Sequence, residues 1–181
     1  MKDFTNIRIK TERLFLRNLQ LDDISQDYID WLNDPEINKY LSSSNSRQTL
    51  ESCQQYVMSY QQNDDAALIG VFLKDNGVHI GNLTFVATEW RNKTTAIGIA
   101  IGRKECMGKG FAVEALSAAA KYCFETLGFN RLYARVNVQN IRALGLFLNS
   151  GFRIEGILRK SDNIDGEFQD SYMVSLLKTD L

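Results

Sequence analysis

The sequence predicts a mixed α/β fold: one mostly antiparallel sheet with helices on both faces. Runs of consecutive strand-like segments without intervening helices indicate antiparallel pairing. A strand, a glycine-rich turn, a helix and a further strand follow one another over residues 94–138, which indicates one parallel pair joined by a right-handed crossover. The 181 residues suffice for one hydrophobic core, and no linker or repeat divides them, so residues 1–181 are expected to form a single domain.

The first third of the chain predicts one strand and two helices. Residues 7–19 alternate apolar and polar side chains, which is typical of a half-buried strand. Residues 21–34 repeat apolar side chains at helical spacing, and Asp22 or Asp23 is expected near the N-cap of that helix. A second helix is expected around residues 47–62.

The remaining elements alternate between consecutive strands and single helices. Strands are expected at 66–74, 78–87 and 94–102, a helix at 109–127, a strand at 131–138, a helix at 140–150, and strands at 152–162 and 168–178. The segment Lys-Asp-Asn-Gly, residues 74–77, is typical of a hairpin turn. Gly128 and Gly151 follow the two expected helices and are typical stop signals.

Composition and charge exclude several classes of protein. The net charge is −1, whereas a general nucleic-acid binder usually has a clear basic excess, so no nucleic-acid partner is expected. The first 18 residues are charged every few positions, so no signal peptide is expected, and no apolar run approaches the roughly 20 residues that span a bilayer. The three cysteines and one histidine lack the spacing of a disulfide framework or metal site. A reduced, cytoplasmic protein without a metal or membrane partner is expected.

Residues 105–115, Glu-Cys-Met-Gly-Lys-Gly-Phe-Ala-Val-Glu-Ala, place two glycines around a lysine just before the expected helix. The P-loop pattern fails because Gly110 stands where serine or threonine should follow Lys109, and the dinucleotide pattern fails at Val113. Free backbone N–H groups and the helix dipole would still point at one spot before the helix. A local basic excess surrounds the turn: Arg91, Lys93, Arg103, Lys104 and Lys109, against Glu105 alone. A phosphate site and a purely structural turn both remain open.

The order of these motifs is more specific than any one of them. It runs through Ala-Ile-Gly-Ile-Ala-Ile-Gly (96–102), the glycine turn, the strand at 131–138, Asn-Ile-Arg-Ala (140–143) and Asn-Ser-Gly-Phe-Arg-Ile-Glu-Gly (149–156). This order resembles the GNAT superfamily of N-acetyltransferases. The segments at 11–23 and 166–177 are similar to its ribosomal-protein-alanine acetyltransferase branch, so that the resemblance covers about residues 8–178.

The resemblance implies a GNAT fold with a central splayed parallel pair, and acetyl-CoA as cosubstrate. The family's phosphate loop, Gln/Arg-x-x-Gly-x-Gly/Ala, corresponds to residues 105–110, whose backbone would hold the coenzyme A pyrophosphate. The strand at 94–102 would splay from its parallel neighbour, helped by a bulge. A backbone N–H near Ile99 to Ile101 would polarise the acetyl carbonyl. The residues expected to contact the cofactor are Ile99, Ile101, Arg103, Met107, Gly108, Lys109, Gly110, Phe111, Ala112, Asn140 and Phe147.

The family's chemistry is direct attack of an amine on acetyl-CoA within a ternary complex, and the resemblance leaves its proton donor unassigned. Phe147 stands where the family commonly has a tyrosine acid, and Ala143 where the branch has a serine. The replacements considered are Tyr133, Ser150 and Tyr172, alongside water or an unassisted thiolate. The candidate bases are Asp162 and Glu89, although the simpler explanation of each is an exposed turn carboxylate.

The sequence leaves the acceptor open between a protein N-terminal amine, a polyamine or aminoglycoside, and an amino sugar. Its pocket is expected from loops near 36–46 and 88–94 and from the final hairpin. The aspartates at 23–34 are either a solvated helix face or an attractant for a cationic amine. Trp31 and Trp90 are either core residues or pocket walls. The alternative function is an acyl-CoA-binding module with weak or no catalysis, and homodimerisation stays open.

Overall fold

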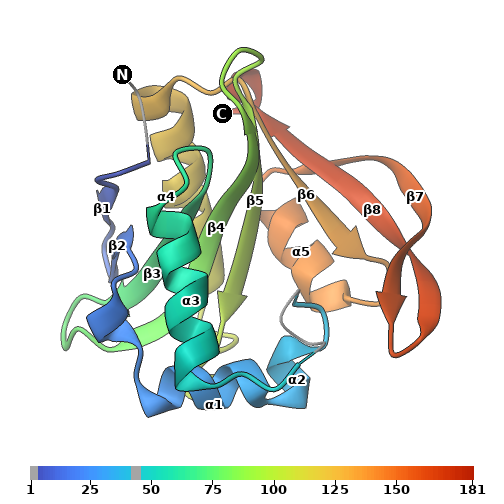
Figure 1. Cartoon of the computed structure of the whole chain (residues 1–181). Helices are drawn as coiled ribbons and strands as arrows, with labels where there is room; N and C mark the ends of the chain where they lie inside the picture. Colours follow the sequence, from blue (N-terminus) through green and yellow to red (C-terminus); the bar gives the residue numbers. More distant parts are fainter. Residues whose placement is uncertain (1–3, 42–45) are drawn as a thin grey trace.

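The computed structural model describes residues 4–41 and 46–181 and contains an eight-stranded sheet (Figure 1). The strands are β1 (Arg8–Lys10), β2 (Leu14–Asn18), β3 (Ala67–Leu73), β4 (His79–Glu89), β5 (Thr94–Ile101), β6 (Arg131–Asn137), β7 (Arg153–Ile164) and β8 (Glu167–Leu177). Their order across the sheet is β1-β2-β3-β4-β5-β6-β8-β7, and only the β5–β6 pair is parallel among these strands. The predicted mixed, mostly antiparallel sheet is confirmed.

The single strand predicted over residues 7–19 is wrong, because this segment forms the two antiparallel strands β1 and β2. Ile9 pairs with Leu16. The Thr11 N–H donates to the Leu14 carbonyl at 3.0 Å, and the Leu14 N–H donates to Thr11 Oγ1 at 2.8 Å. Apolar and polar residues alternate on both sides of this turn, so the period of two does not reveal where the chain reverses.

β5 and β6 pair over three residues and then separate. Thr94–Ala96 face Arg131–Tyr133. Beyond Ala96, β5 stays bonded to β4 while β6 continues beside β8, which confirms the predicted splayed pair. The adjacent irregularity lies between Val86 and Glu89 on β4, so the bulge is on the neighbouring strand and not on β5.

Helices cover both faces of the sheet, as predicted (Figure 1). α3 (Leu50–Gln61) lies in front of the sheet in this view, and α1 (Gln26–Asn33) and α2 (Pro35–Asn38) lie along its lower end. α4 (Phe111–Tyr122) lies behind the sheet with α5 (Ile141–Asn149) in contact with it. α4 continues through a π-helical turn over Cys123–Leu127 and ends at Gly128, whose φ is +78°. The predicted helix end at this glycine is confirmed.

The expected N-cap of the first helix is wrong. Leu21–Asp23 form a separate 3₁₀ turn, and Ser25 caps α1 by accepting a hydrogen bond from the Tyr28 N–H at 3.2 Å. Asp23 instead accepts two hydrogen bonds of 2.6 Å from Arg17 of β2. Aspartate and serine are both good caps, so cap preference does not decide between them, whereas the ion pair of Asp23 with Arg17 on the preceding strand does.

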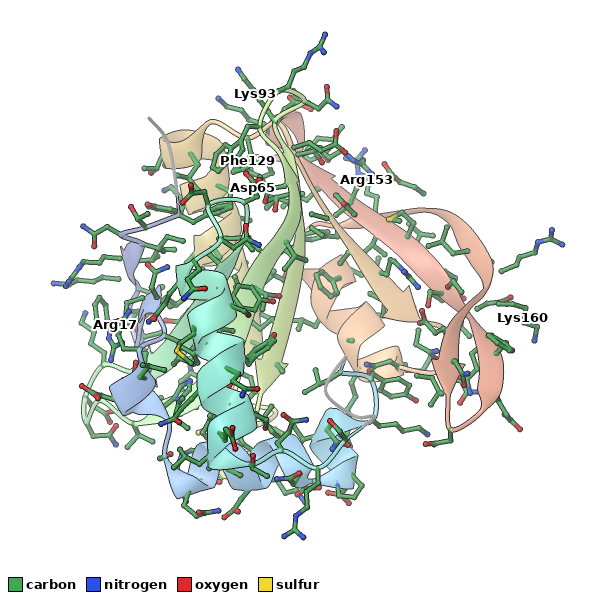
Figure 2. The ribbon with its side chains drawn as sticks, viewed as in Figure 1. Arg17, Asp65, Lys93, Phe129, Arg153 and Lys160 are labelled. Atoms are coloured by element: carbon green, nitrogen blue, oxygen red, sulfur yellow. The ribbon has the colours of Figure 1, made fainter. Side chains whose placement is uncertain are left out.

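Two groups of buried apolar side chains hold the layers together. The larger lies between the sheet and α4 and includes Phe85, Phe124 and Phe129; the smaller lies under α1 and α3 around Tyr28. Figure 2 shows Phe129 within the fold, whereas Lys160 lies on the outside of the β7–β8 ribbon. Full burial of each such ring contributes about 1.5–3 kcal/mol. Over the described residues, no helix is both long and apolar enough to span a membrane.

Candidate active site

The glycine loop leaves its backbone open in front of α4. Gly108 and Gly110 have φ values of +72° and +80°, a left-handed conformation that favours glycine. A Cβ atom on Gly108 would meet no heavy atom within 4 Å, and one on Gly110 would meet only Arg13 Nη2 at 3.4 Å. Gly110 is the N-cap of α4 and supplies no side-chain cap. The first N–H groups of α4, from Phe111 onward, therefore face an open space without intrahelical partners.

The backbone N–H groups of the loop that are available to a ligand begin after Met107. The Met107 N–H donates to the Lys104 carbonyl at 3.1 Å within a short 3₁₀ turn, so it is already used. The Glu114 N–H donates to the Gly110 carbonyl at 3.0 Å, which closes the first turn of α4. The N–H groups of residues 108–112 lie between these two bonds, at the positive end of the helix dipole.

Two of the basic residues near the loop are already paired with carboxylates. Arg103 donates to Asp27 and, at 3.1 Å, to Glu105. Lys104 lies 2.7 Å from both Asp34 and Glu36, whose carboxylates accept its hydrogen bonds and raise the pKa of its ammonium. The expected cationic patch is thus partly neutralised by α1 and α2.

Lys109 lies within the loop and has no ion pair in the described part of the chain. Its charge is therefore available to an anion held by the surrounding backbone N–H groups. Lys109 is exposed, so this contribution would be screened by salt.

Arg13, at the turn between β1 and β2, clamps the glycine loop and was missed by sequence reasoning. Its Nε donates to Glu114 at 2.7 Å, and its Nη1 donates to the Lys109 carbonyl at 3.0 Å. The guanidinium carbon lies 4.4 Å from the centre of the Phe111 ring. Glu114 also accepts hydrogen bonds from the Arg13 N–H at 2.9 Å and the Thr11 hydroxyl at 2.6 Å. About 100 residues separate these partners in the chain, so no local pattern signals the contact.

The cleft between β5 and β6 opens where their pairing stops. Residues 97–101 of β5 have no partner on the β6 side. At the far end of β6, Asn140 caps α5 by accepting the Ala143 N–H at 3.1 Å. Asn137 Nδ2 is buried there without a hydrogen-bond partner in the described structure. These amides can bind polar atoms of a ligand that lies along the open edge of β5.

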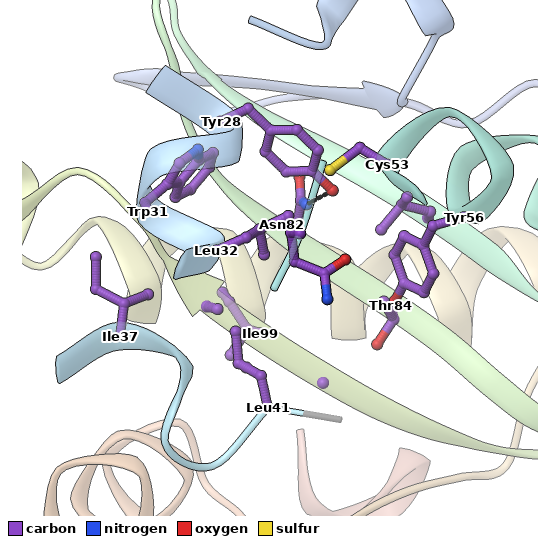
Figure 3. Close-up of a pocket in the computed structure, with 14 residues that line it drawn as sticks. Tyr28, Trp31, Leu32, Ile37, Leu41, Cys53, Tyr56, Asn82, Thr84 and Ile99 are labelled. Atoms are coloured by element: carbon purple, nitrogen blue, oxygen red, sulfur yellow. Dashed lines mark hydrogen bonds between the residues drawn. The ribbon is translucent and has the colours of Figure 1, made fainter. Parts of the chain in front are cut away.

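A pocket of about 160 Å³ lies on the front face, at the same stretch of β5 (Figure 3). Its lining residues come from α1, α2, α3 and three strands. They are Tyr28, Trp31, Leu32, Ile37, Leu41, Gln48, Cys53, Tyr56, Leu68, Asn82, Thr84, Gly98, Ile99 and Ala100. Ile37 and Leu41 belong to the expected loop at 36–46, and residues 42–45 lie outside the described residues. No described residue of 88–94 or of the final hairpin lines this pocket, so their part in an acceptor site stays a prediction.

A hydrogen-bonded chain fixes the polar side of the pocket. His79 Nε2 lies 3.0 Å from the Gly81 carbonyl and 2.9 Å from Asn82 Oδ1. Both partners are acceptors, so Nε2 carries the hydrogen, and burial lowers the pKa of His79, which keeps its ring neutral. Asn82 Nδ2 then donates to the Tyr28 hydroxyl at 3.1 Å (Figure 3). The Tyr28 hydroxyl keeps its own proton to donate, since burial raises its pKa.

Trp31 is both a core residue and a wall of the pocket. A Cβ atom on Gly102 would fall 0.6 Å from Trp31 Cε3, so the indole lies directly against the backbone that leads from β5 into the glycine loop. Trp90 is a core residue: it packs against Phe4 and Phe129, and its Nε1 donates to Asp65 at 2.7 Å.

The two candidate bases lie apart from the pocket. Asp162, on β7, accepts hydrogen bonds from Arg135 at 2.5 Å and from Ser171. Glu89 is exposed at the end of β4, where it accepts a hydrogen bond of 2.5 Å from Asn92 and faces Thr94. Thr94 is five residues before Ile99 on β5, which corresponds to about 16 Å along a strand. The base role of either carboxylate stays a prediction.

The positions considered for the proton donor lie on or at the ends of β6, α5 and β8, and Tyr133 pairs with Ala96 where the β5–β6 pairing ends. Phe147 is 5% exposed and packs edge-on against Phe152 at 5.0 Å, so that its ring belongs to the core. Ala143 lies in the first turn of α5. The Ser150 hydroxyl donates to the Leu146 carbonyl at 2.9 Å. Tyr172 is partly buried against the core.

A protein-family model described as the acetyltransferase (GNAT) domain matches residues 13–153, which include the glycine loop, β5 and Asn140. The chain belongs to the GNAT acetyltransferase family. The N-acetyltransferase p20 of Bacillus licheniformis is 32% identical over 174 residues, which cover 93% of this chain and 94% of the relative. GNAT acetyltransferases use acetyl-CoA, and this chain is therefore an acetyl-CoA-dependent N-acetyltransferase by family.

Two further relatives illustrate the range of acceptors in this GNAT group. The [ribosomal protein uS5]-alanine N-acetyltransferase of Escherichia coli is 34% identical over 84 residues, which cover 46% of this chain and 43% of the relative. A spermidine N-acetyltransferase from Vibrio cholerae, solved in complex with CoA and spermine, superposes with a TM-score of 0.84 at 23% identity. That superposition covers 94% of this chain and 98% of the other, and it shows that the fold is shared. The similarity to the ribosomal-protein-alanine branch is confirmed.

Proposed function

We propose that this protein transfers the acetyl group of acetyl-CoA to a primary amine that is bound in the front pocket. One observation carries the proposal: the unpaired edge of β5 adjoins both sites. Residues 98–100 line the pocket, and the same strand leads through Gly102 into the glycine loop. An amine in the pocket and a thioester along the β5 edge would therefore be held next to each other.

The glycine loop and the β5–β6 cleft fit coenzyme A. The N–H groups of residues 108–112 would bind the pyrophosphate, and the open space beside Gly108 and Gly110 would admit it. The Asn140 amide and the backbone of Ile99 and Ile101 would bind the pantetheine arm. Bound acetyl-CoA supplies an acetyl group already activated as a thioester.

The remaining work of the protein is to orient the two reactants. The nitrogen lone pair attacks the acetyl carbonyl, the C–N bond forms, and the C–S bond breaks with the electron pair leaving on sulfur. A backbone N–H near Ile99 to Ile101 would stabilise the negative charge that develops on the carbonyl oxygen. A thiol pKa of about 8.5 lets sulfur leave as a thiolate without a dedicated acid, in keeping with Phe147 and Ala143 at the usual donor positions.

Asp162 and Glu89 remain the proposed bases for the proton that the amine loses. We expect Asp162→Asn to lower kcat about 100-fold, the lower range for a general base, and to leave the dissociation constant of acetyl-CoA unchanged. The acetylation rate and a calorimetric titration measure the two effects. Full activity of this variant would remove Asp162 as the base and leave Glu89→Gln as the next variant to assay.

A second candidate function is an acyl-CoA-binding module, which is favoured by the burial of Phe147 and by Ala143. The thermal unfolding midpoint with and without acetyl-CoA tests the coenzyme site that both candidates need; no shift would refute both. Release of free thiol from acetyl-CoA in a panel of amines separates them. The three cysteines are buried, so a thiol reagent reports mainly the released coenzyme A. If none of the amines in the panel causes thiol release, the binding module is favoured.

A further inference from the structure

We propose that the acceptor is a compact primary amine with an apolar or aromatic body and no second positive charge, and not a polyamine. This inference rests on the proposed function and names the substrate class of its pocket. Three independent features of the pocket support it: the charge of its walls, its size and the hydroxyl group of Tyr28.

The walls of the pocket offer no counter-charge. None of its described lining residues is acidic or basic. Residues 42–45, which lie outside the described residues, read Ser-Ser-Ser-Asn in the sequence and have no ionisable side chain. Moving an ammonium group out of water is costly unless a carboxylate pairs with it. A polyamine would have to place such a group here, or leave its charged chain outside.

Most carboxylates of α1 and its flanks are already paired. Asp27 binds Arg103, and Asp34 and Glu36 both bind Lys104. Asp30 is exposed and accepts a hydrogen bond of 2.7 Å from Gln26. None of these carboxylates lines the pocket.

The size of the pocket fits one small ring. A cavity of about 150 Å³ lined by apolar side chains holds benzene, and this pocket has about 160 Å³. Tyr28 and Trp31 meet edge-to-face at 5.3 Å, and Tyr56 lies across the pocket from them (Figure 3). A flat apolar body would contact all three rings, whereas an extended polyamine chain would leave them unfilled.

The Tyr28 hydroxyl adds a directed polar contact. Asn82 donates to it, so its own proton is free to meet a hydroxyl or carbonyl oxygen on the acceptor. A buried donor without a partner is costly. An aromatic amine with one such oxygen would therefore bind better than the same amine without it.

Neutral walls also favour the reactive form of the amine. Burial away from carboxylates disfavours the ammonium and lowers its pKa, which raises the fraction with a free lone pair. The rate should therefore rise about tenfold per pH unit below the pKa of the amine in solution, when acceptor is scarce.

The test compares kcat/KM of the wild-type protein for benzylamine, spermidine and a short peptide with N-terminal alanine, by thiol release at one pH. We expect benzylamine to exceed each of the others by at least tenfold. A higher value for spermidine or for the peptide would overturn the inference while leaving acetyl transfer intact. Absence of thiol release with all three, when acetyl-CoA still shifts the unfolding midpoint, would refute the proposed catalysis itself and this inference with it.

A pair of variants tests the charge argument within the same pocket. Thr84→Asp places a carboxylate in the wall, and Thr84→Asn places an uncharged group of the same shape. We expect the ratio of kcat/KM for spermidine to that for benzylamine to rise at least tenfold in Thr84→Asp relative to Thr84→Asn. An equal ratio in the two variants, with both still stabilised by acetyl-CoA, would contradict the argument. If Thr84→Asp does not fold, the wild-type comparison decides.

Discussion

The glycine loop and the front pocket both adjoin β5, yet the loop presents backbone groups and the pocket presents side chains. The loop depends on backbone conformation: two left-handed glycines and the first turn of α4 form it within about ten consecutive residues. The pocket is lined by residues of α1, α2, α3 and three strands, and its shape depends on their side chains. Backbone geometry follows from local sequence, whereas a side-chain cavity exists only after distant elements pack together. A site formed by local backbone can therefore be predicted from one sequence, whereas a site formed by side chains of distant elements cannot.

The largest expected effect concerns the glycine loop. Gly110→Asp places a carboxylate beside the proposed pyrophosphate site and a Cβ atom at a φ of +80°. We expect the dissociation constant of acetyl-CoA to rise about 100-fold. The carboxylate would repel the pyrophosphate and so offset the attraction of the helix N-terminus for it. Calorimetric titration measures it.

Gly110→Asn is the matched control, since asparagine has the same shape and tolerates the left-handed region. Its dissociation constant should rise less than that of Gly110→Asp. Unchanged affinity in Gly110→Asp would mean that the loop does not hold the pyrophosphate.

The next effect concerns the junction between the loop and the pocket. Gly102→Ala would drive a methyl group into the Trp31 ring, and overpacking of this kind costs about 1–3 kcal/mol. We expect a lower free energy of unfolding in urea and a higher KM for the acceptor, because Trp31 must leave the pocket wall. Gly156→Ala is the control, since its Cβ atom would meet nothing within 4 Å. Equal stability of the two variants would show that Trp31 can move without cost.

Arg13→Ala should have a moderate effect on the loop alone. Loss of the contacts to Glu114 and the Lys109 carbonyl would loosen the loop, and we expect about a three- to tenfold weaker affinity for acetyl-CoA. Charge-assisted hydrogen bonds of this kind contribute about 1.5–3 kcal/mol, reduced here by solvent exposure. Arg8→Ala is the control on the adjacent strand. Identical affinities of the two variants would separate Arg13 from coenzyme binding.

The smallest effect is the pH dependence of stability that His79 causes. Burial lowers the pKa of His79 in the folded protein, so the unfolded chain binds the extra proton first as pH falls below about 6.5. Stability should therefore decrease between pH 7 and pH 5, through the reference pKa, because the unfolded state takes up more protons. The urea midpoint of His79→Gln should decrease less over this range, since His79 is the only histidine. Equal decreases in the two proteins would show that His79 does not contribute.

The elements that were predictable share strong local periodicity. Strands β3 to β6 and helix α4 follow from their apolar patterns, and the end of the helical segment follows from Gly128. The β1–β2 turn did not, because alternation runs through it, and the Ser25 cap did not, because Asp23 is drawn to Arg17 instead. Contacts of particular side chains, which the apolar pattern does not specify, decided both cases.

The site divides in the same way. Gly108, Gly110 and Asn140 could be proposed as site residues from the sequence, because their proposed roles depend on position within a local motif. Arg13, the contact between Trp31 and Gly102, and the His79–Asn82–Tyr28 chain depend on segments that meet only in the folded sheet. The front pocket is lined from α1, α2, α3 and three strands and not from 88–94 or the final hairpin, and no local pattern of the sequence indicates that combination.

The central claim is that the edge of β5 holds both reactants at once. The most direct measurement is the initial rate of amide formation from acetyl-CoA and benzylamine, with each substrate varied at several fixed concentrations of the other. Direct attack within a ternary complex predicts double-reciprocal lines that intersect. Parallel lines, together with an acetylated protein when the amine is omitted, would reveal a ping-pong route and contradict the claim.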